Sequence, residues 1–146
     1  SRPRPLTGGE VVGVGRYLFL VGEPIGQGAY ACVWSATLVG SGCEVAIKEM
    51  KCGRGPGILP DASVDRARFE IQAMQKLAGE ADESGGGESP EIAAPRVFDH
   101  QFWPMGPSMP GAFLCRVAMT RRMGRPLVNW LDSRLASYAA CAAPAL

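Results

Sequence analysis

Short runs of apolar and β-branched residues, separated by turns rich in Gly and Pro, make up most of the chain. Five such runs predict strands at residues 17–25, 32–39, 43–50, 95–103 and 113–119. The sequence Gly40-Ser41-Gly42 between the second and third runs is a hairpin-turn signal. Because the first three runs are joined by short turns, we expect them to form an antiparallel meander.

One segment, residues 64–78, repeats its apolar positions at helical spacing instead. These positions are Val64, Ala67, Ile71, Met74, Leu77 and Ala78. Asp61 or Ser63 is placed to cap the N-terminus of the helix. The predicted fold is therefore α+β, with a five-stranded antiparallel sheet and one main helix between strands 3 and 4.

The remaining segments predict less structure. Residues 1–14 are rich in Pro, Gly and Arg and are expected to be a flexible lead-in, while residues 79–90 form an acidic, glycine-rich loop. Residues 127–138 predict a short helix before an alanine-rich tail.

Composition narrows the class of protein. The 146 residues are 47% hydrophobic and 20% charged, which is typical of one globular domain with a core. The formal net charge of +1 gives no reason to expect nucleic acid or an anionic membrane surface as a partner. No apolar run approaches the roughly 20 residues needed to span a bilayer, so no membrane anchor is predicted.

The five cysteines are scattered along the chain and include no CxxC pair. Such spacing fits neither a zinc site nor a disulfide framework. We therefore expect free thiols in a reducing compartment, which would be cytoplasmic or nuclear.

A glycine-rich turn is the first candidate for chemistry, and it reads Ile25-Gly26-Gln27-Gly28-Ala29-Tyr30-Ala31-Cys32-Val33. Glycines allow a backbone turn to lie against phosphates. The other interpretations are an ordinary β-turn or a dinucleotide-binding turn, but the latter needs a helix directly after the glycines. Here a β-type run follows, which favours a glycine loop between two antiparallel strands. A P-loop is excluded because no Gly-Lys-Ser/Thr ending is present.

Lys48 stands at the end of an otherwise apolar strand segment, Val45-Ala46-Ile47. Strand alternation places Ala46 and Lys48 on one face, where a small residue beside a lysine suits a base and its phosphates. An exposed strand lysine is the simpler alternative. Glu70 falls on the apolar stripe of the predicted helix, and an unpaired carboxylate there costs several kcal/mol. We therefore expect Glu70 to pair with Lys48 rather than reach water.

Taken together, four segments resemble the N-terminal lobe of a eukaryotic protein kinase. They are Gly26-x-Gly28-x-x-Ala31-x-Val33, Val45-Ala46-Ile47-Lys48, Phe69-Glu70-Ile71-x-x-Met74-x-x-Leu77, and residues 117–127. The resemblance covers about residues 17–135, with the segments in the right order. By this resemblance, residues 1–14 precede the kinase lobe, residues 15–124 form the lobe and hinge, and residues 125–146 begin the C-terminal lobe.

The resemblance implies a role for each site residue. Lys48 would bind the α- and β-phosphates of ATP while Glu70 holds it in place. Met119 would guard the back of the adenine pocket, and residues 120–123 would be the hinge. The implied ATP-binding set is Ile25, Gly26, Gln27, Gly28, Ala29, Val33, Ala46, Lys48, Met119, Thr120 and Arg122. Mg²⁺ is the implied metal, with its ligands expected in a C-terminal lobe outside this chain.

Several positions depart from the family pattern. Ala31 replaces the third glycine of the loop, and Thr120 is neutral where an acidic residue is frequent. No His-Arg-Asp or Asp-Phe-Gly motif occurs, and the only histidine, His100, is followed by Gln-Phe. Asp99 and Asp132 are expected to be isolated carboxylates. The catalytic base and metal ligands are therefore predicted to be missing from this chain.

Two functional hypotheses follow. The first is the ATP-binding part of a protein kinase, preferably of serine/threonine type, which in intact form transfers the γ-phosphoryl of Mg-ATP to protein hydroxyls. The alternative is a non-catalytic, pseudokinase-like module that acts through protein–protein contacts.

Overall fold

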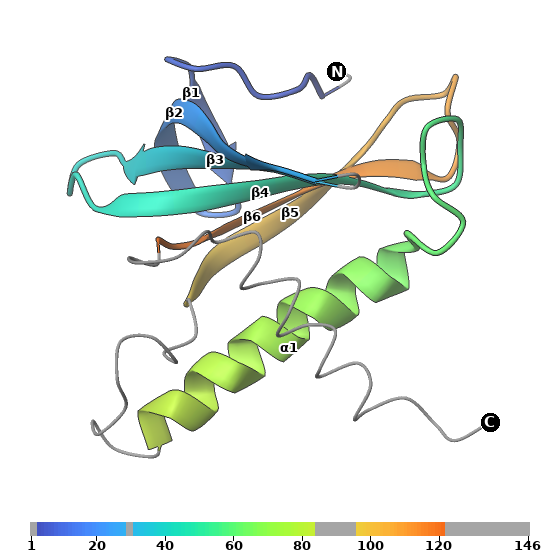
Figure 1. The fold of residues 1–146 in the computed structure, drawn as a ribbon. Helices are drawn as coiled ribbons and strands as arrows, with labels where there is room; N and C mark the ends of the chain where they lie inside the picture. Colours follow the sequence, from blue (N-terminus) through green and yellow to red (C-terminus); the bar gives the residue numbers. More distant parts are fainter. Residues whose placement is uncertain (1–2, 29–30, 84–95, 122–146) are drawn as a thin grey trace.

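The computed structural model describes residues 3–28, 31–83 and 96–121. These residues form an antiparallel six-stranded sheet in the order β1-β2-β3-β4-β6-β5, with one helix packed on one of its faces (Figure 1). The elements are β1 (Val11–Val14), β2 (Tyr17–Gln27), β3 (Ala31–Leu38), β4 (Glu44–Gly53), α1 (Val64–Glu83), β5 (Val97–Pro104) and β6 (Ala112–Thr120). No helix in this part of the chain has the length and apolar character to cross a membrane.

The α+β class agrees with the sequence-based expectation, but the number of strands was wrong. The sixth strand, β1, lies in the segment expected to be a flexible lead-in, and it pairs with β2 through a two-residue turn. Gly15 opens that turn with φ +58°, and a Cβ there would lie 2.1 Å from a carboxylate oxygen of Asp99. Only glycine fits this position.

The helix α1 begins where its sequence predicts. The Ser63 hydroxyl oxygen accepts a hydrogen bond from the backbone N–H of Arg66 at 3.0 Å, so Ser63 is the N-cap. Along the chain the helix lies between β4 and β5, and it extends to Glu83 rather than ending at residue 78. A single glycine at position 79 weakens a helix without ending it. The helix predicted at residues 127–138 lies outside the described residues.

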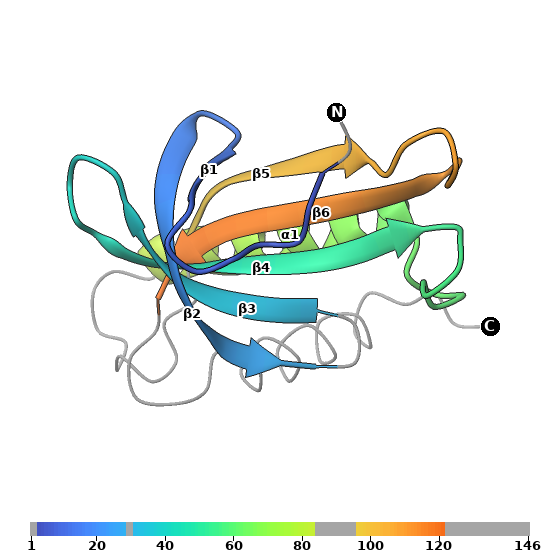
Figure 2. The same ribbon diagram turned by 90° about the horizontal axis from the view of Figure 1, so that it is seen from above.

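The sheet has a separate buried core on each face. Successive residues of β4 point to opposite sides, so the core on the helix side takes Ala46 and Met50 while the other core takes Val45 and Ile47. The helix contributes Ala67, Ile71, Ala73 and Met74 to the first core. A segment before β1 crosses the other face (Figure 2) and contributes Leu6, which is only 3% exposed.

The two edge strands approach each other, so the sheet curls toward a barrel. The turn after β1 meets β5: the N–H of Gly15 donates to Gln101 Oε1 at 2.9 Å, and that of Arg16 donates to Asp99 Oδ2 at 3.1 Å. Asp99 is therefore not the isolated carboxylate that the sequence suggested. Burial alone would raise the pKa of Asp99, but backbone hydrogen bonds from His100 and Arg16, together with the Arg16 charge, lower it below its ordinary value.

Candidate functional site

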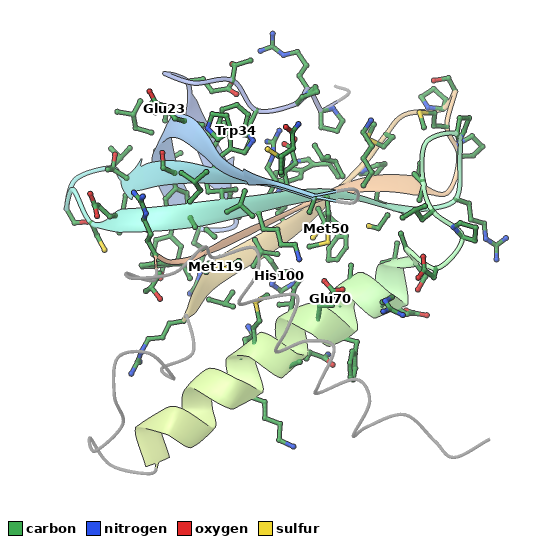
Figure 3. The ribbon with its side chains drawn as sticks, in the orientation of Figure 1. Glu23, Trp34, Met50, Glu70, His100 and Met119 are labelled. Carbon is green, nitrogen blue, oxygen red and sulfur yellow. The ribbon has the colours of Figure 1, made fainter. Side chains whose placement is uncertain are left out.

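Lys48 and Glu70, which were predicted to pair, lie within ion-pair distance between β4 and α1. Lys48 Nζ is 3.6 Å from Glu70 Oε2, and the two side chains are 9% and 25% exposed. Figure 3 shows Glu70 on the side of α1 that faces the sheet. Burying a lysine to this extent is costly without a nearby carboxylate, and the helix supplies one.

The residues expected to contact a base surround Lys48 on the helix face of the sheet. Val33 pairs with Lys48, and Ala46 pairs with Met119, which places all four side chains on that face. Val33, Ala46 and Met119 are each at most 1% exposed and belong to the core cluster that includes Ile71. They pack against neighbouring side chains rather than line an open cleft.

The glycine-rich turn joins β2 to β3 beside this face. β2 runs as far as Gln27, with Gly26 paired to Val33, and the N–H of Gly28 donates to the carbonyl of Ala31 at 2.9 Å. The β2–β3 register shifts on both sides of Pro24, where the missing N–H of proline is tolerated at a bulge. Ile25 is 37% exposed, and Gln27 and Gly28 are also exposed.

The turn glycines are not required by the backbone that the structure describes. Neither Gly26 nor Gly28 is among the glycines with positive φ. Among the described residues, a Cβ added at Gly28 would meet the carbonyl oxygen of Ala31 at 3.8 Å, which is an ordinary contact. None of the residues that the structure describes therefore excludes a side chain at this position.

The expected hinge is described only at its start. Thr120 ends β6, where its N–H donates to the carbonyl of Arg96 and its Oγ1 accepts from the N–H of Arg96, each at 2.9 Å. These bonds fix the end of β6 against the chain entering β5. Two other predicted ATP-binding residues, Ala29 and Arg122, lie outside the described residues.

The described part of the chain contains no group of three or more His, Cys, Asp or Glu side chains that could hold a metal ion. Its four cysteines, Cys32, Cys43, Cys52 and Cys115, are free thiols. Burial raises the pKa of Cys52 to about 11 and that of Cys115 to about 12, so both remain protonated and unreactive.

A second ion pair, which the sequence did not reveal, lies on the other face of the sheet. Arg116 Nε donates to Glu49 Oε2 at 2.9 Å, with the side chains 9% and 12% exposed. The Arg116 guanidinium also donates to the carbonyl of Arg4 and lies 5.0 Å from the ring centroid of Trp103. In the sequence Arg116 only interrupts an apolar run, and the register that places it opposite Glu49 is not visible there.

Comparison with known proteins gives similarity in structure but not in sequence. No protein-family model matches the chain, and no curated protein matches it in sequence. Among solved structures, the chain matches the crystal structure of the BubR1 kinase domain with 16% sequence identity and a TM-score of 0.47, over 83% of this chain. It spans 29% of that chain's length. A TM-score below 0.5 at this identity assigns neither a family nor an activity to the chain.

Proposed function

We propose that this chain is the ATP-binding lobe of a protein kinase, preferably of serine/threonine type. In the intact protein, the γ-phosphoryl of Mg-ATP would be transferred to protein hydroxyls. In this chain the phosphates bind between the glycine-rich turn and Lys48, and the base lies toward Ala46 and Met119. The catalytic base and the ligands of Mg²⁺ come from outside the described residues.

The observation that carries the proposal is the buried Lys48–Glu70 pair beside the glycine-rich turn. Lys48 is 7% exposed, and its neighbour across the sheet is Val33, the third residue of β3. Taking the Lys48 ammonium group out of water costs free energy, and a hydrophobic residue at this position would stabilise the core equally well. The positively charged Lys48 side chain is instead suited to bind an anion that lies against the glycine-rich turn.

The glycines support the same conclusion. Since the backbone at Gly28 is unstrained and a Cβ there meets no close neighbour, folding alone does not account for the glycine. Close approach of a phosphate to the backbone N–H groups does account for it.

Binding of a base also requires a local rearrangement. Val33, Ala46 and Met119 are fully buried, so they must become accessible before an adenine can lie against them. A shift of α1 relative to the sheet would expose them, and the 3.6 Å separation of Lys48 and Glu70 allows such a shift more readily than a short hydrogen bond would.

Calorimetric titration of the purified chain with ATP in the presence of MgCl₂ tests the proposal. We expect saturable binding that Lys48→Met weakens at least about tenfold, a loss of roughly 1.4 kcal/mol, because the phosphates lose their cation. The matched control is Lys76→Met, which removes an exposed lysine from the same helix that carries Glu70. No binding at millimolar ATP, or equal binding by the Lys48→Met chain, would contradict the proposal.

A further inference from the structure

One cavity among the described residues lies along the end of β4, and Lys48 does not line it. Its volume is about 620 Å³, within the range of ligand-binding clefts. It occupies a notch in the sheet: β3 begins at Ala31, opposite Met50, while β4 continues to Gly53 paired with β6 but with no strand on its β3 side. The chain before β1 and the loop before α1 form the two walls of the notch.

Residues from both faces of the sheet line the notch: Met50 belongs to the core on the helix side, whereas Glu49 points to the other side. Glu49 and Lys51 of β4 line it, whereas Lys48 does not. The wall before β1 contributes Pro3, Arg4 and Pro5, and it is fixed in place because the Arg4 carbonyl accepts a hydrogen bond from the buried Arg116. The segment before β1 is therefore held against the sheet and forms a fixed wall of the notch.

The lining combines apolar surface with unpaired positive charge. Apolar contacts come from Pro5, Leu59, Met105 and Leu114, and the charged groups are Arg4, Glu49 and Lys51. The Glu49 carboxylate is already bound by Arg116 at 2.9 Å, so its charge is balanced. Arg4 and Lys51 remain, and together they favour an anionic group held beside an apolar one.

We propose that this notch binds a short extended peptide of a partner protein, with an acidic side chain next to a bulky apolar one. Nucleic acid fits less well, because only two uncompensated cations line the notch and the chain carries a net charge of +1. A membrane surface fits less well, because the apolar residues are recessed rather than displayed on a protruding face. Gln27 and Gly28, which belong to the proposed ATP-binding set, also line the notch, so the two sites adjoin; the peptide proposal rests on Arg4, Lys51 and Leu59, which are outside that set.

A random heptapeptide phage library selected against the full chain tests the proposal. We expect the selected peptides to be enriched in Asp or Glu adjacent to Leu, Ile or Phe. The most enriched peptide, labelled with fluorescein, is then titrated by fluorescence anisotropy. Lys51→Gln should weaken its binding about threefold, as for an exposed ion pair, and Leu59→Ser about fivefold through lost apolar contact.

Matched controls are Arg66→Gln for charge and Leu18→Ser for an exposed apolar residue, since neither residue lines the notch. Both controls should leave the anisotropy titration unchanged. Lys51 is exposed, so its variant keeps the test valid even if Leu59→Ser fails to fold. Selection without acidic enrichment, or equal binding by site and control variants, would overturn the proposal.

Discussion

Two adjacent residues of β4, Lys48 and Glu49, each form an ion pair, and the two pairs differ in distance, exposure and the element that supplies the partner. Lys48 faces the helix and lies 3.6 Å from Glu70, whose side chain is 25% exposed. Glu49 faces the other side and is hydrogen-bonded at 2.9 Å to Arg116, with both side chains at most 12% exposed. One pair links two layers of the fold, whereas the other joins directly opposed residues of neighbouring strands.

A buried charged side chain is held more firmly when its partner lies on a paired strand than when the partner lies on the helix packed against the sheet. Sheet register fixes Arg116 opposite Glu49, so that pair cannot open without disturbing the β4–β6 pairing. Glu70 lies on the helix and is 25% exposed, so no strand pairing holds its contact with Lys48 and water can reach it. We therefore propose that the Glu49–Arg116 pair serves stability and that the Lys48–Glu70 pair serves ligand binding.

Glu49→Gln should have the largest effect on stability. It leaves the Arg116 guanidinium, which is 8% exposed, without a carboxylate, and we expect a loss of about 3 kcal/mol in the free energy of unfolding. Urea unfolding followed by tryptophan fluorescence measures it. The double variant Glu49→Gln with Arg116→Met should regain much of the loss, and a change below about 1 kcal/mol in the single variant would contradict a structural role.

Glu70→Gln should cost less stability but more ligand affinity. Since Glu70 is partly exposed, we expect about 1 kcal/mol in the free energy of unfolding, as for a pair that water can reach. ATP binding should weaken severalfold because Lys48 is no longer held, whereas Glu49→Gln should leave ATP binding unchanged. Calorimetric titration of both variants decides this, and the reverse ranking of their affinities would contradict the assignment.

Asp99→Asn should have the smallest effect, because its partner Arg16 is 83% exposed at 3.7 Å. The folded-state pKa of Asp99 is lowered, so its contribution to stability is present at neutral pH and lost as the pH falls below about 4. We expect the variant to lose less than about 1 kcal/mol at pH 7. Urea unfolding at pH 7 and pH 3 measures the difference between variant and wild type, which should shrink at pH 3 rather than grow.

Local signals in the sequence predicted much of the helix-side arrangement. Helical spacing placed Glu70 on the apolar side of its helix, and the turn after Val39 was marked by two glycines, both of which have positive φ. These signals could be read because each depends on residues close together in the chain. The short strand β1 was missed because its four residues include Gly13 and show no clear alternation.

Long-range features could not be read in the same way. Pairing of Glu49 with Arg116 depends on the register between β4 and β6, and a shift of one residue would turn their side chains to the other face. The burial of Met119 likewise follows from how α1 packs on the sheet. The sequence suggested an adenine contact there but did not show that the residue is covered.

Hydrogen–deuterium exchange of the chain with and without Mg-ATP tests the nucleotide proposal most directly. We expect slower exchange on ATP binding in the amides of residues 25–33 and 45–48, and no such slowing in the Lys48→Met chain. Unchanged exchange at saturating ATP, or slowing confined to residues 49–62 around the notch, would contradict binding at Lys48.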